Sequence, residues 1–346
     1  MTLRVGIVGA GRIGSLHARN VANHPRLKLA GIHDVEGARA AALAAQHGCA
    51  ALPSLAALLD AGVDAVVVAS STDTHAETAV TCARAGKALY VEKPIDLDFA
   101  KALAAARDIE ASGVPAMVGF NRRFDPVYRE LRDEVRSGRL GRLQVVQMTS
   151  RGPNETPTPD YIRHSGGIHR DKSVHFFDLL RYLTGREAVE IAAMSATLAD
   201  DFIGALGDVD TSVMQLRLDD GALCQIENAR RAVYGFDERV EIFGTAGLRE
   251  AGRTRSRIAS AAEGGAFGTP FPRGFMHRFE GAFAGAVDGF ARLVLDGDRD
   301  VPTIADGIAA QAIAEAAAVS TRDGRPITLH DTLRAFDDAT RAPEAR

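Results

Sequence analysis

The sequence has few cysteines, no long apolar run and no block of one charge. Its three cysteines, Cys49, Cys82 and Cys224, lie far apart and show neither metal-ligand nor redox spacing. Unpaired thiols of this kind are typical of a reducing compartment. No run approaches the roughly 18 apolar residues of a membrane span, and the start, MTLRVGIVGAGRIG, has no signal-peptide core. We therefore expect a cytoplasmic protein with no membrane partner.

The charges are nearly balanced, with 41 Lys and Arg against 45 Asp and Glu and a formal net charge of −4. A nucleic-acid-binding surface needs a concentrated basic field, so we expect no nucleic-acid partner. The composition, 46% hydrophobic and 25% charged, is that of an ordinary globular protein. A chain of 346 residues is long enough for two domains with sizeable cores.

The first third of the chain alternates short apolar runs with alanine-rich amphipathic stretches. The predicted strands are residues 3–8, 27–32, 65–69, 88–91 and 115–118, and the predicted helices are residues 16–22, 38–46, 55–59 and 76–85. Gly86 has the place of the glycine that follows a helix end. Strand and helix in alternation predict an α/β fold, with a doubly wound parallel sheet of the Rossmann type and right-handed crossovers.

From about residue 121 the predicted strands become longer and alternate in polarity. They are residues 143–149, 189–197, 211–218, 222–228 and 238–243, with a hairpin turn indicated at Asp219–Asp220–Gly221. One buried face and few helices predict a second α/β domain with an open, mostly antiparallel sheet. A surface loop is predicted at 253–274, and helices at 275–295 and 304–320. The domains expected are 1–120 for dinucleotide binding, 121–330 for substrate binding and oligomerisation, and a tail at 331–346.

A G-x-G-x-x-G motif lies between the first predicted strand and helix. Its first glycine permits a tight turn, its second lets the backbone approach a pyrophosphate, and its third allows close helix–sheet packing. The helix N-terminus faces the phosphates. The residues expected to contact the cofactor here are Gly9, Gly11, Arg12, Ile13 and Gly14.

Asp34 lies twenty residues after Gly14, at the end of the second predicted strand, where a ribose-binding acid belongs. Its carboxylate can accept hydrogen bonds from both ribose hydroxyls. It would repel a 2′-phosphate by on the order of 4 kcal/mol at an effective dielectric of 20. The cofactor expected is therefore NAD, with NADP less favoured. Arg12 and Arg39 are nearby cations that soften this preference.

Several stretches beyond this loop resemble the Gfo/Idh/MocA oxidoreductases, and in particular the inositol 2-dehydrogenase branch. They are ASSTDTH at 69–75, Gly86–Lys87 leading to EKPIDL at 92–97, GFNRRFD at 119–125, Ser165–Gly166–Gly167 followed by Asp171 and His175, and NARRAVYGFD at 228–237. E-K-P is common to the whole family, whereas the G-F-N-R-R-F-D stretch and the Y-G-F-D stretch point to the inositol branch. The likeness extends from residue 3 to about residue 328.

The resemblance implies oxidation of a ring hydroxyl to a ketone with NAD as acceptor, and commonly a homotetramer that associates through the exposed face of the second sheet. It implies that Lys93, Asp171 and His175 are the catalytic residues. The substrate-binding residues implied are these three together with Arg123 and Tyr234. The cofactor-lining residues implied are Ser70, Thr72, His75, Glu92, Lys93 and Asn121.

The chemistry of the three catalytic candidates fits alcohol oxidation. Histidine suits a base because its ordinary pKa lies close to neutral pH. Asp171 and His175 are spaced i, i+4, so on a helix they share a face and the carboxylate can orient the imidazole. Lys93 can stabilise alkoxide character on the substrate oxygen. The alternative for the Asp–His pair is a structural one, and Lys93 before Pro94 is also consistent with a simple strand end. Arg123 and Tyr234 are equally consistent with loop caps or partners of acids.

The substrate is less defined than the chemistry, because Lys172 and Phe176 depart from the family's usual residues beside the catalytic positions. Inositol is the first expectation, oxidised from myo-inositol to 2-keto-inositol. A monosaccharide or an anhydrosugar such as glucose or levoglucosan, oxidised or reduced with NAD or NADP, is the alternative. A non-catalytic NAD-binding sensor is a different class.

The histidines suggest no metal site. His169, Asp171 and His175 match a ferrous-iron ligand set in type, but the dinucleotide motif supplies its own hydride acceptor, so we expect no metal. Six other histidines show no pattern and are predicted at the surface or as caps. They are His17, His24, His33, His47, His277 and His330.

Overall fold

The computed structural model describes residues 2–153, 155–252, 261–262, 265–266 and 274–330. These residues form two compact units. The first contains residues 2–124 and 281–311, and the second contains the described residues of 125–280 and 312–330. The tail from 331 and most of the predicted loop at 253–274 lie outside the described residues. No described helix has the length and apolarity that a bilayer crossing requires.

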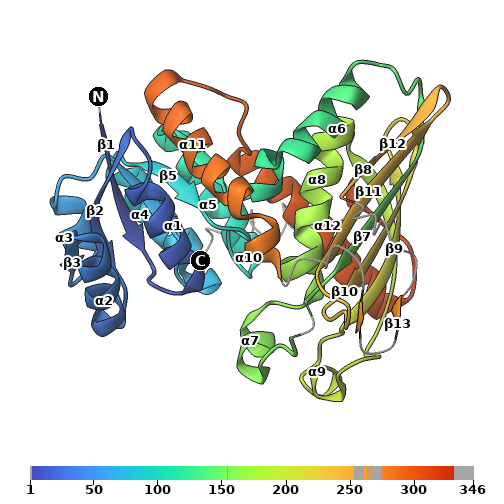
Figure 1. Cartoon of the computed structure of the whole chain (residues 1–346), viewed down its shortest axis with the longest axis horizontal. Coiled ribbons are helices and arrows are strands. Elements are labelled where there is room, and N and C mark those ends of the chain that lie inside the picture. The colour runs from blue at the N-terminus through green and yellow to red at the C-terminus, as the bar shows by residue number, and fades with distance from the viewer. Residues whose placement is uncertain (1, 154, 253–260, 263–264, 267–273, 331–346) are drawn as a thin grey trace, which may run out of the picture. The chain divides into compact units, whose positions relative to one another are not determined.

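The first unit is built on a six-stranded parallel sheet in the order β3-β2-β1-β4-β5-β6 (Figure 1). This order is that of a doubly wound dinucleotide-binding fold and confirms the prediction. The central strands β4 and β5 are buried along their whole length, because helices cover both faces of such a sheet. The strands are β1 (Leu3–Val8), β2 (Leu27–His33), β3 (Ala50–Leu52), β4 (Ala65–Val68), β5 (Ala88–Val91) and β6 (Ala116–Val118).

The helices of the first unit include one that the sequence analysis did not predict. This helix, α5 (Phe99–Ser112), begins where the Asp98 side chain accepts hydrogen bonds from the N–H groups of Ala100 and Lys101. The predicted helices are all present, and Gly86 follows the C-cap of α4 as expected. The helices are α1 (Arg12–Ala22), α2 (Gly37–His47), α3 (Leu55–Asp60) and α4 (His75–Arg84), with short 3₁₀ turns η1 (Thr72–Thr74) and η2 (Asn121–Phe124).

Helix α11 (Glu280–Asp296) belongs almost entirely to the first unit. The domain boundary expected from the sequence, at residue 120, places this helix in the second domain. Its side chains Val287, Phe290 and Leu293 join the core cluster of the parallel sheet. Helix α12 (Ile304–Asp323) then runs from the first unit into the second. The first unit is therefore completed by a segment distant in sequence. The local sequence pattern of such a helix shows an apolar face but does not indicate which of the two sheets that face covers.

The second unit is built on a seven-stranded mixed sheet in the order β12-β11-β7-β10-β9-β8-β15. Among the described strands of this sheet, only β7 and β10 pair in parallel, so the sheet is mostly antiparallel, as predicted. The turn at 219–221 joins β9 to β10, with the N–H of Gly221 bonded to the carbonyl of Leu218. The strands are β7 (Leu143–Arg151), β8 (Ala188–Ala196), β9 (Thr211–Leu218), β10 (Leu223–Ala229), β11 (Asp237–Gly244), β12 (Gly247–Ala251) and β15 (Ile327–Thr328).

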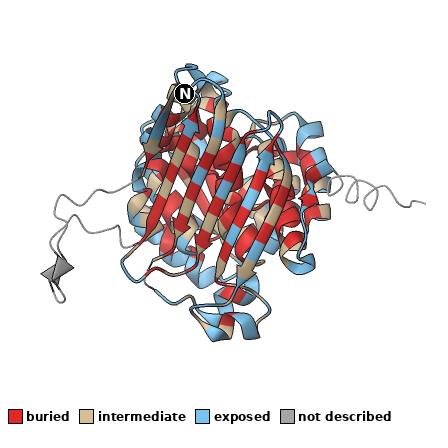
Figure 2. Ribbon diagram, turned by 90° about the vertical axis from the view of Figure 1, so that its right-hand side faces the viewer, coloured by how far each residue is buried: buried red, intermediate tan, exposed pale blue. Residues whose placement is uncertain are grey.

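One face of this sheet is open. Figure 2 shows the sheet face-on with no described helix in front of it, and buried and exposed residues alternate along the strands. The other face carries helices, with α6 and α8 beside it in Figure 1. There are more helices than predicted, because the charged surface of α6 concealed its two buried anchors, Tyr128 and Leu131. They are α6 (Pro126–Arg136), α7 (Pro159–His164), α8 (Val174–Thr184), α9 (Asp201–Ala205) and α10 (Phe275–Arg278).

Candidate active site

The three glycines of the phosphate loop have the steric roles that the motif predicts. Gly9 has φ +102°, and a Cβ there would lie 2.3 Å from the carbonyl oxygen of Ala69. A Cβ on Gly14 would lie 1.9 Å from the carbonyl oxygen of Gly9, so α1 can approach the loop only with glycine at this position. A Cβ on Gly11 would meet no atom of the described residues within 4 Å. The protein itself therefore requires Gly9 and Gly14, whereas Gly11 borders open space.

The N-terminus of α1 is suited to bind an anion. Its N-cap, Gly11, has no side chain to cap the helix, and the N–H groups of the first turn, from Arg12 to Gly14, have no acceptor within an α-helix. These N–H groups and the helix dipole favour a negative group such as a pyrophosphate. The loop and helix together fit the phosphates of a dinucleotide.

Asp34 is held in a fixed orientation just after β2. Its Oδ2 accepts a hydrogen bond from the N–H of Ala10 at 2.7 Å, and its Oδ1 accepts one from the N–H of Glu36 at 2.8 Å. Each carboxylate oxygen keeps a lone pair for a ribose hydroxyl. Arg39 pairs with Glu36 at 2.9 Å, and both side chains are exposed. Asp34 thus reaches the phosphate loop, as the NAD assignment requires.

Asn121, at the carboxyl end of β6, offers a buried donor to a ligand. It is only 1% exposed; its Oδ1 accepts a hydrogen bond from Arg122, and its Nδ2 has no hydrogen-bond partner among the described residues. Buried amide donors are almost always satisfied, so this one fits a ligand that brings an acceptor. Ser70 and Thr72 lie at the carboxyl end of β4, where Ser70 is hydrogen-bonded to Thr74 at 2.7 Å.

The E-K-P residues follow β5, and Lys93 is partly buried there with a cis peptide bond to Pro94. The Glu92 carboxylate is bonded to His17 Nε2 at 2.7 Å and accepts a hydrogen bond from the N–H of Lys93 at 3.2 Å. The prediction that His17 lies at the surface or caps a helix is wrong: it is fully buried, against Tyr90 and Phe283. His75 is also buried, and its two nitrogens contact the carbonyl oxygens of Pro94 and Ser70. Glu92 and His75 thus bind their own chain.

Arg123, assigned by resemblance to the substrate, forms a bidentate ion pair with Asp306 of α12, at 3.0 and 3.1 Å. The sequence is equally consistent with Arg123 as the partner of an acid, and this ion pair matches that alternative. Both side chains are largely buried.

Asp171 and His175 lie on two different kinds of helix in the second unit. Asp171 lies in a π-helical turn, η3 (His169–Ser173), and His175 in the first turn of α8. The N–H of Val174 bonds to the carbonyl of His169, five residues back. A π turn changes the angular spacing assumed for an i, i+4 pair, and such turns occur often at functional sites. Burial lowers the pKa of His169 to about 4, so this residue is neutral near pH 7.

A partly buried network of hydrogen bonds and ion pairs surrounds Asp171. Its Oδ2 accepts hydrogen bonds from the Tyr161 hydroxyl at 2.6 Å and from Arg230 at 3.0 Å. Arg230 also pairs with Asp208 at 2.7 Å, and its side chain is 4% exposed. Burial acts to lower the pKa of the Arg230 guanidinium, but Asp171 and Asp208 hold it above its ordinary value. Sequence analysis missed Tyr161, Asp208 and Arg230 as partners, although Arg230 lies in a stretch it singled out.

The two departures from the family pattern lie in different surroundings. Lys172 donates a hydrogen bond to Ser150 of β7 at 2.9 Å and lies over the Phe236 ring. Phe176 is fully buried in the core of the second unit. Tyr234 is 43% exposed, and its hydroxyl donates to Asp237 and accepts from Arg151, both at 2.8 Å.

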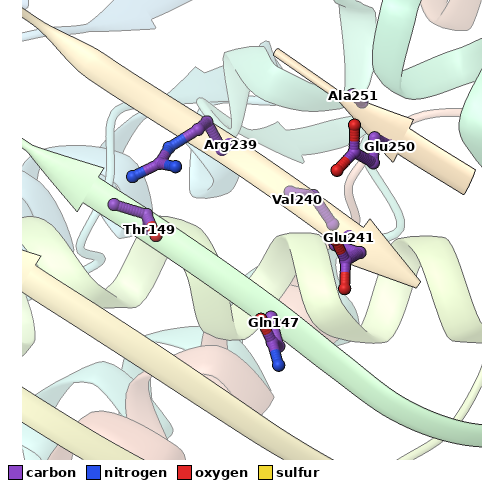
Figure 3. A pocket seen from close by; sticks show the side chains of 7 residues that line it. All are labelled: Gln147, Thr149, Arg239, Val240, Glu241, Glu250 and Ala251. Carbon is purple, nitrogen blue, oxygen red and sulfur yellow. The ribbon is translucent and has the colours of Figure 1, made fainter. Parts of the chain in front are cut away.

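A shallow pocket lies on the open face of the second sheet (Figure 3), and its lining contains none of the site candidates. It is bordered by side chains of β7, β11 and β12: Gln147, Thr149, Arg239, Val240, Glu241, Glu250 and Ala251.

Replacing Arg230 with methionine is expected to destabilise the protein by about 3–5 kcal/mol, because two carboxylates would lose their shared buried cation. Urea unfolding of wild type and variant measures the difference. Arg84→Met is the control, since Arg84 is 72% exposed and its pairing with Asp108 should contribute at most about 1 kcal/mol. Equal stability losses in the two variants would contradict the buried-network account.

Comparisons with known proteins agree with this geometry. Residues 3–120 match the oxidoreductase family with an NAD-binding Rossmann fold, Gfo/Idh/MocA, and residues 128–249 match the C-terminal domain of the same family. The chain is 39% identical to the inositol 2-dehydrogenase of Rhizobium meliloti, covering 95% of this chain and all of that protein. It is 36% identical to the myo-inositol 2-dehydrogenase of Thermotoga maritima, over 96% of this chain and all of that protein.

A solved structure shows the same architecture. The scyllo-inositol dehydrogenase of Lactobacillus casei, solved with bound NAD(H) and scyllo-inositol, superposes with a TM-score of 0.88. The sequences are 25% identical, and the likeness covers 95% of this chain and all of that one.

Proposed function

We propose that this chain, which belongs to the Gfo/Idh/MocA oxidoreductase family, oxidises myo-inositol to 2-keto-inositol with NAD as the hydride acceptor. The full-length likeness to inositol 2-dehydrogenases carries the substrate assignment. The same relatives favour inositol over the monosaccharide and anhydrosugar alternatives. A sensor that only binds NAD has no chemical need for the lysine, aspartate and histidine at 93, 171 and 175.

The residues of the first unit suit NAD. The N–H groups at the start of α1 bind the pyrophosphate, Asp34 binds the adenosine ribose, and the Asn121 amide donates to an acceptor on the cofactor. Bound NAD supplies a hydride acceptor for the substrate carbon.

Each residue assigned to the reaction has a separate role: removing the proton, stabilising the negative charge or orienting the base. His175 takes the hydroxyl proton, so the oxygen becomes a carbonyl as the carbon loses its hydride. Lys93 hydrogen-bonds the substrate oxygen and stabilises its developing negative charge. Asp171 orients the base; its own carboxylate is fixed by Tyr161 and Arg230. Tyr234, whose side chain is partly exposed, contacts the inositol ring.

The substrate is tested by offering the purified protein NAD and a panel of alcohols, with absorbance of NADH as the readout. The panel contains myo-, scyllo- and chiro-inositol, glucose, xylose and levoglucosan. We expect kcat/KM to be highest for myo-inositol. Highest activity on a sugar would retain the hydride chemistry and contradict the inositol assignment.

Asp34→Ser is expected to lower the ratio of kcat/KM for NAD over NADP by at least about tenfold. A tenfold change is about 1.4 kcal/mol, which is well below the roughly 4 kcal/mol repulsion expected between Asp34 and a 2′-phosphate at an effective dielectric of 20. Asp60→Ser removes an exposed acid of α3 and serves as the control. An unchanged ratio in folded Asp34→Ser protein would show that Asp34 does not select the cofactor.

We propose that the chain is a homotetramer in the cytoplasm, associating through the open face of the second sheet. An apolar row crosses that face on four adjacent strands, where Leu248 pairs with Phe243 and Val145 lies between Phe243 and Leu223. Leu223, Phe243 and Leu248 are each more than 40% exposed in the single chain. Apolar patches of this kind mark association surfaces. Light scattering should give a mass near four times 36.7 kDa, and a monomer mass would contradict the proposal.

A further inference from the structure

Two buried histidines contact the chain on either side of Lys93, and neither was expected to do so. We propose that His17 and His75 are positioning residues that fix Lys93 for the reaction. The proposal rests on the role given to Lys93 in the proposed function. All the contacts that carry it lie within the first unit.

On the N-terminal side, His17 acts through Glu92. His17 is fully buried and is bonded through Nε2 to Glu92 Oε1 at 2.7 Å. The other carboxylate oxygen accepts a hydrogen bond from the N–H of Lys93. Apolar rings of Tyr90 and Phe283 surround the imidazole, so water does not compete for its donor. His17 thereby fixes the carboxylate that holds the backbone of Lys93.

The place of the Glu92 carboxylate is also fixed sterically. A Cβ on Gly119 would lie 2.8 Å from the carboxylate carbon and from both of its oxygens. Glycine at 119 therefore leaves the space that Glu92 occupies, between the His17 ring and the end of β6. Glu92 is 7% exposed, and a buried carboxylate of this kind needs its partners.

On the C-terminal side, His75 contacts the residue after Lys93. His75 is 2% exposed, its Nδ1 lies 2.9 Å from the carbonyl oxygen of Pro94, and its Nε2 lies 3.1 Å from that of Ser70. The imidazole thus bridges the ends of β4 and β5. The Lys93 side chain is a flexible four-carbon stem, so the place of its ammonium depends on a fixed backbone.

The test compares four histidine variants with a matched control. His17→Phe and His75→Phe keep the ring size but remove the nitrogens. His17→Gln keeps a donor near the position of Nε2, and His75→Asn keeps one near Nδ1. The control is His24→Phe, because His24 also pairs with a carboxylate of the first unit, Asp288. The measurements are kcat with myo-inositol, the dissociation constant of NAD from fluorescence, and the melting temperature.

We expect kcat to fall about 10- to 100-fold in each Phe variant, because small displacements of catalytic groups have effects of this size. The NAD dissociation constant should stay within about threefold, since the phosphate loop and Asp34 are untouched. The Gln and Asn variants should recover most of the lost kcat, and His24→Phe should match wild type. Folded Phe variants with wild-type kcat would overturn the proposal, and so would Gln and Asn variants as impaired as the Phe variants.

Gly119→Ala decides the question for the His17 side if His17→Phe does not fold. It keeps both histidines but pushes on the Glu92 carboxylate, so kcat should fall while NAD still binds. Unchanged kcat in Gly119→Ala would overturn that half of the proposal.

Lys93→Met distinguishes a failure of the proposed function from a failure of the positioning proposal. If Lys93→Met is as active as wild type, the role of Lys93 in the proposed function fails; if it is inactive while the Phe variants are unaffected, only the positioning proposal fails.

Discussion

Replacing His175 with alanine is expected to lower kcat for myo-inositol by about 10²- to 10⁴-fold at neutral pH, the usual contribution of a general base. Without the imidazole, the hydroxyl proton has no acceptor when the carbon loses its hydride. NAD affinity should not change, because the cofactor contacts are assigned to the first unit. Steady-state kinetics and NAD binding measure the two effects separately.

The pH dependence identifies His175 as the base more specifically than the loss of rate does. In wild type, kcat/KM should rise with pH as the base becomes deprotonated, and His175→Ala should lose that ionisation. His277→Ala, which removes an exposed histidine of α10, should keep both rate and profile. A His175→Ala enzyme with near-wild-type turnover would mean that the Asp–His pair is structural.

Gly14→Ala is expected to destabilise the first unit even without NAD, whereas Gly11→Ala is expected to fold normally and to bind NAD poorly. A Cβ on Gly14 would lie 1.9 Å from the backbone oxygen of Gly9, and neither backbone can move without displacing α1. Overpacking of a fixed site costs about 1–3 kcal/mol and occasionally more. Circular dichroism and thermal unfolding without NAD measure this effect.

Gly11→Ala tests the ligand directly, because no atom in the described part of the chain lies within 4 Å of the added methyl group. Stability without NAD should change by at most about 1 kcal/mol, the range for an N-cap residue. The methyl group fills space meant for the pyrophosphate, so the same 1–3 kcal/mol of overpacking should weaken NAD binding roughly 5- to 150-fold. Unchanged NAD affinity in Gly11→Ala would contradict the assignment of this loop.

The sequence predicted the elements whose signals are local. The strands of the parallel sheet are short apolar runs buried on both faces, and β5 has the predicted bounds. Helix α5 was missed, although Asp98 is a good N-cap, because its alanines give a weak apolar stripe. Helix α6 was missed because its exposed face is strongly charged. The continuous helix predicted at 275–295 is instead α10 and α11, separated at Phe279.

The site was predictable only as a set of candidate residues. The partners that fix them are far away in sequence: Glu92 is 75 residues from His17, and Arg230 is 59 residues from Asp171. No local pattern predicts such pairs. The π turn at 169–173 was equally hidden, because the i, i+4 rule assumes α-helical geometry. The structure gives Glu92, His75 and Arg123 partners within the protein, which resemblance alone did not.

The most direct test of the account uses myo-inositol carrying deuterium on carbon 2, with NAD and the purified wild-type protein. The account predicts that one deuterium moves from that carbon to the nicotinamide ring for each ketone formed, as NMR of the recovered cofactor shows. NAD that binds but gains no deuterium, with the inositol recovered intact, would contradict hydride transfer from inositol as the function of this protein.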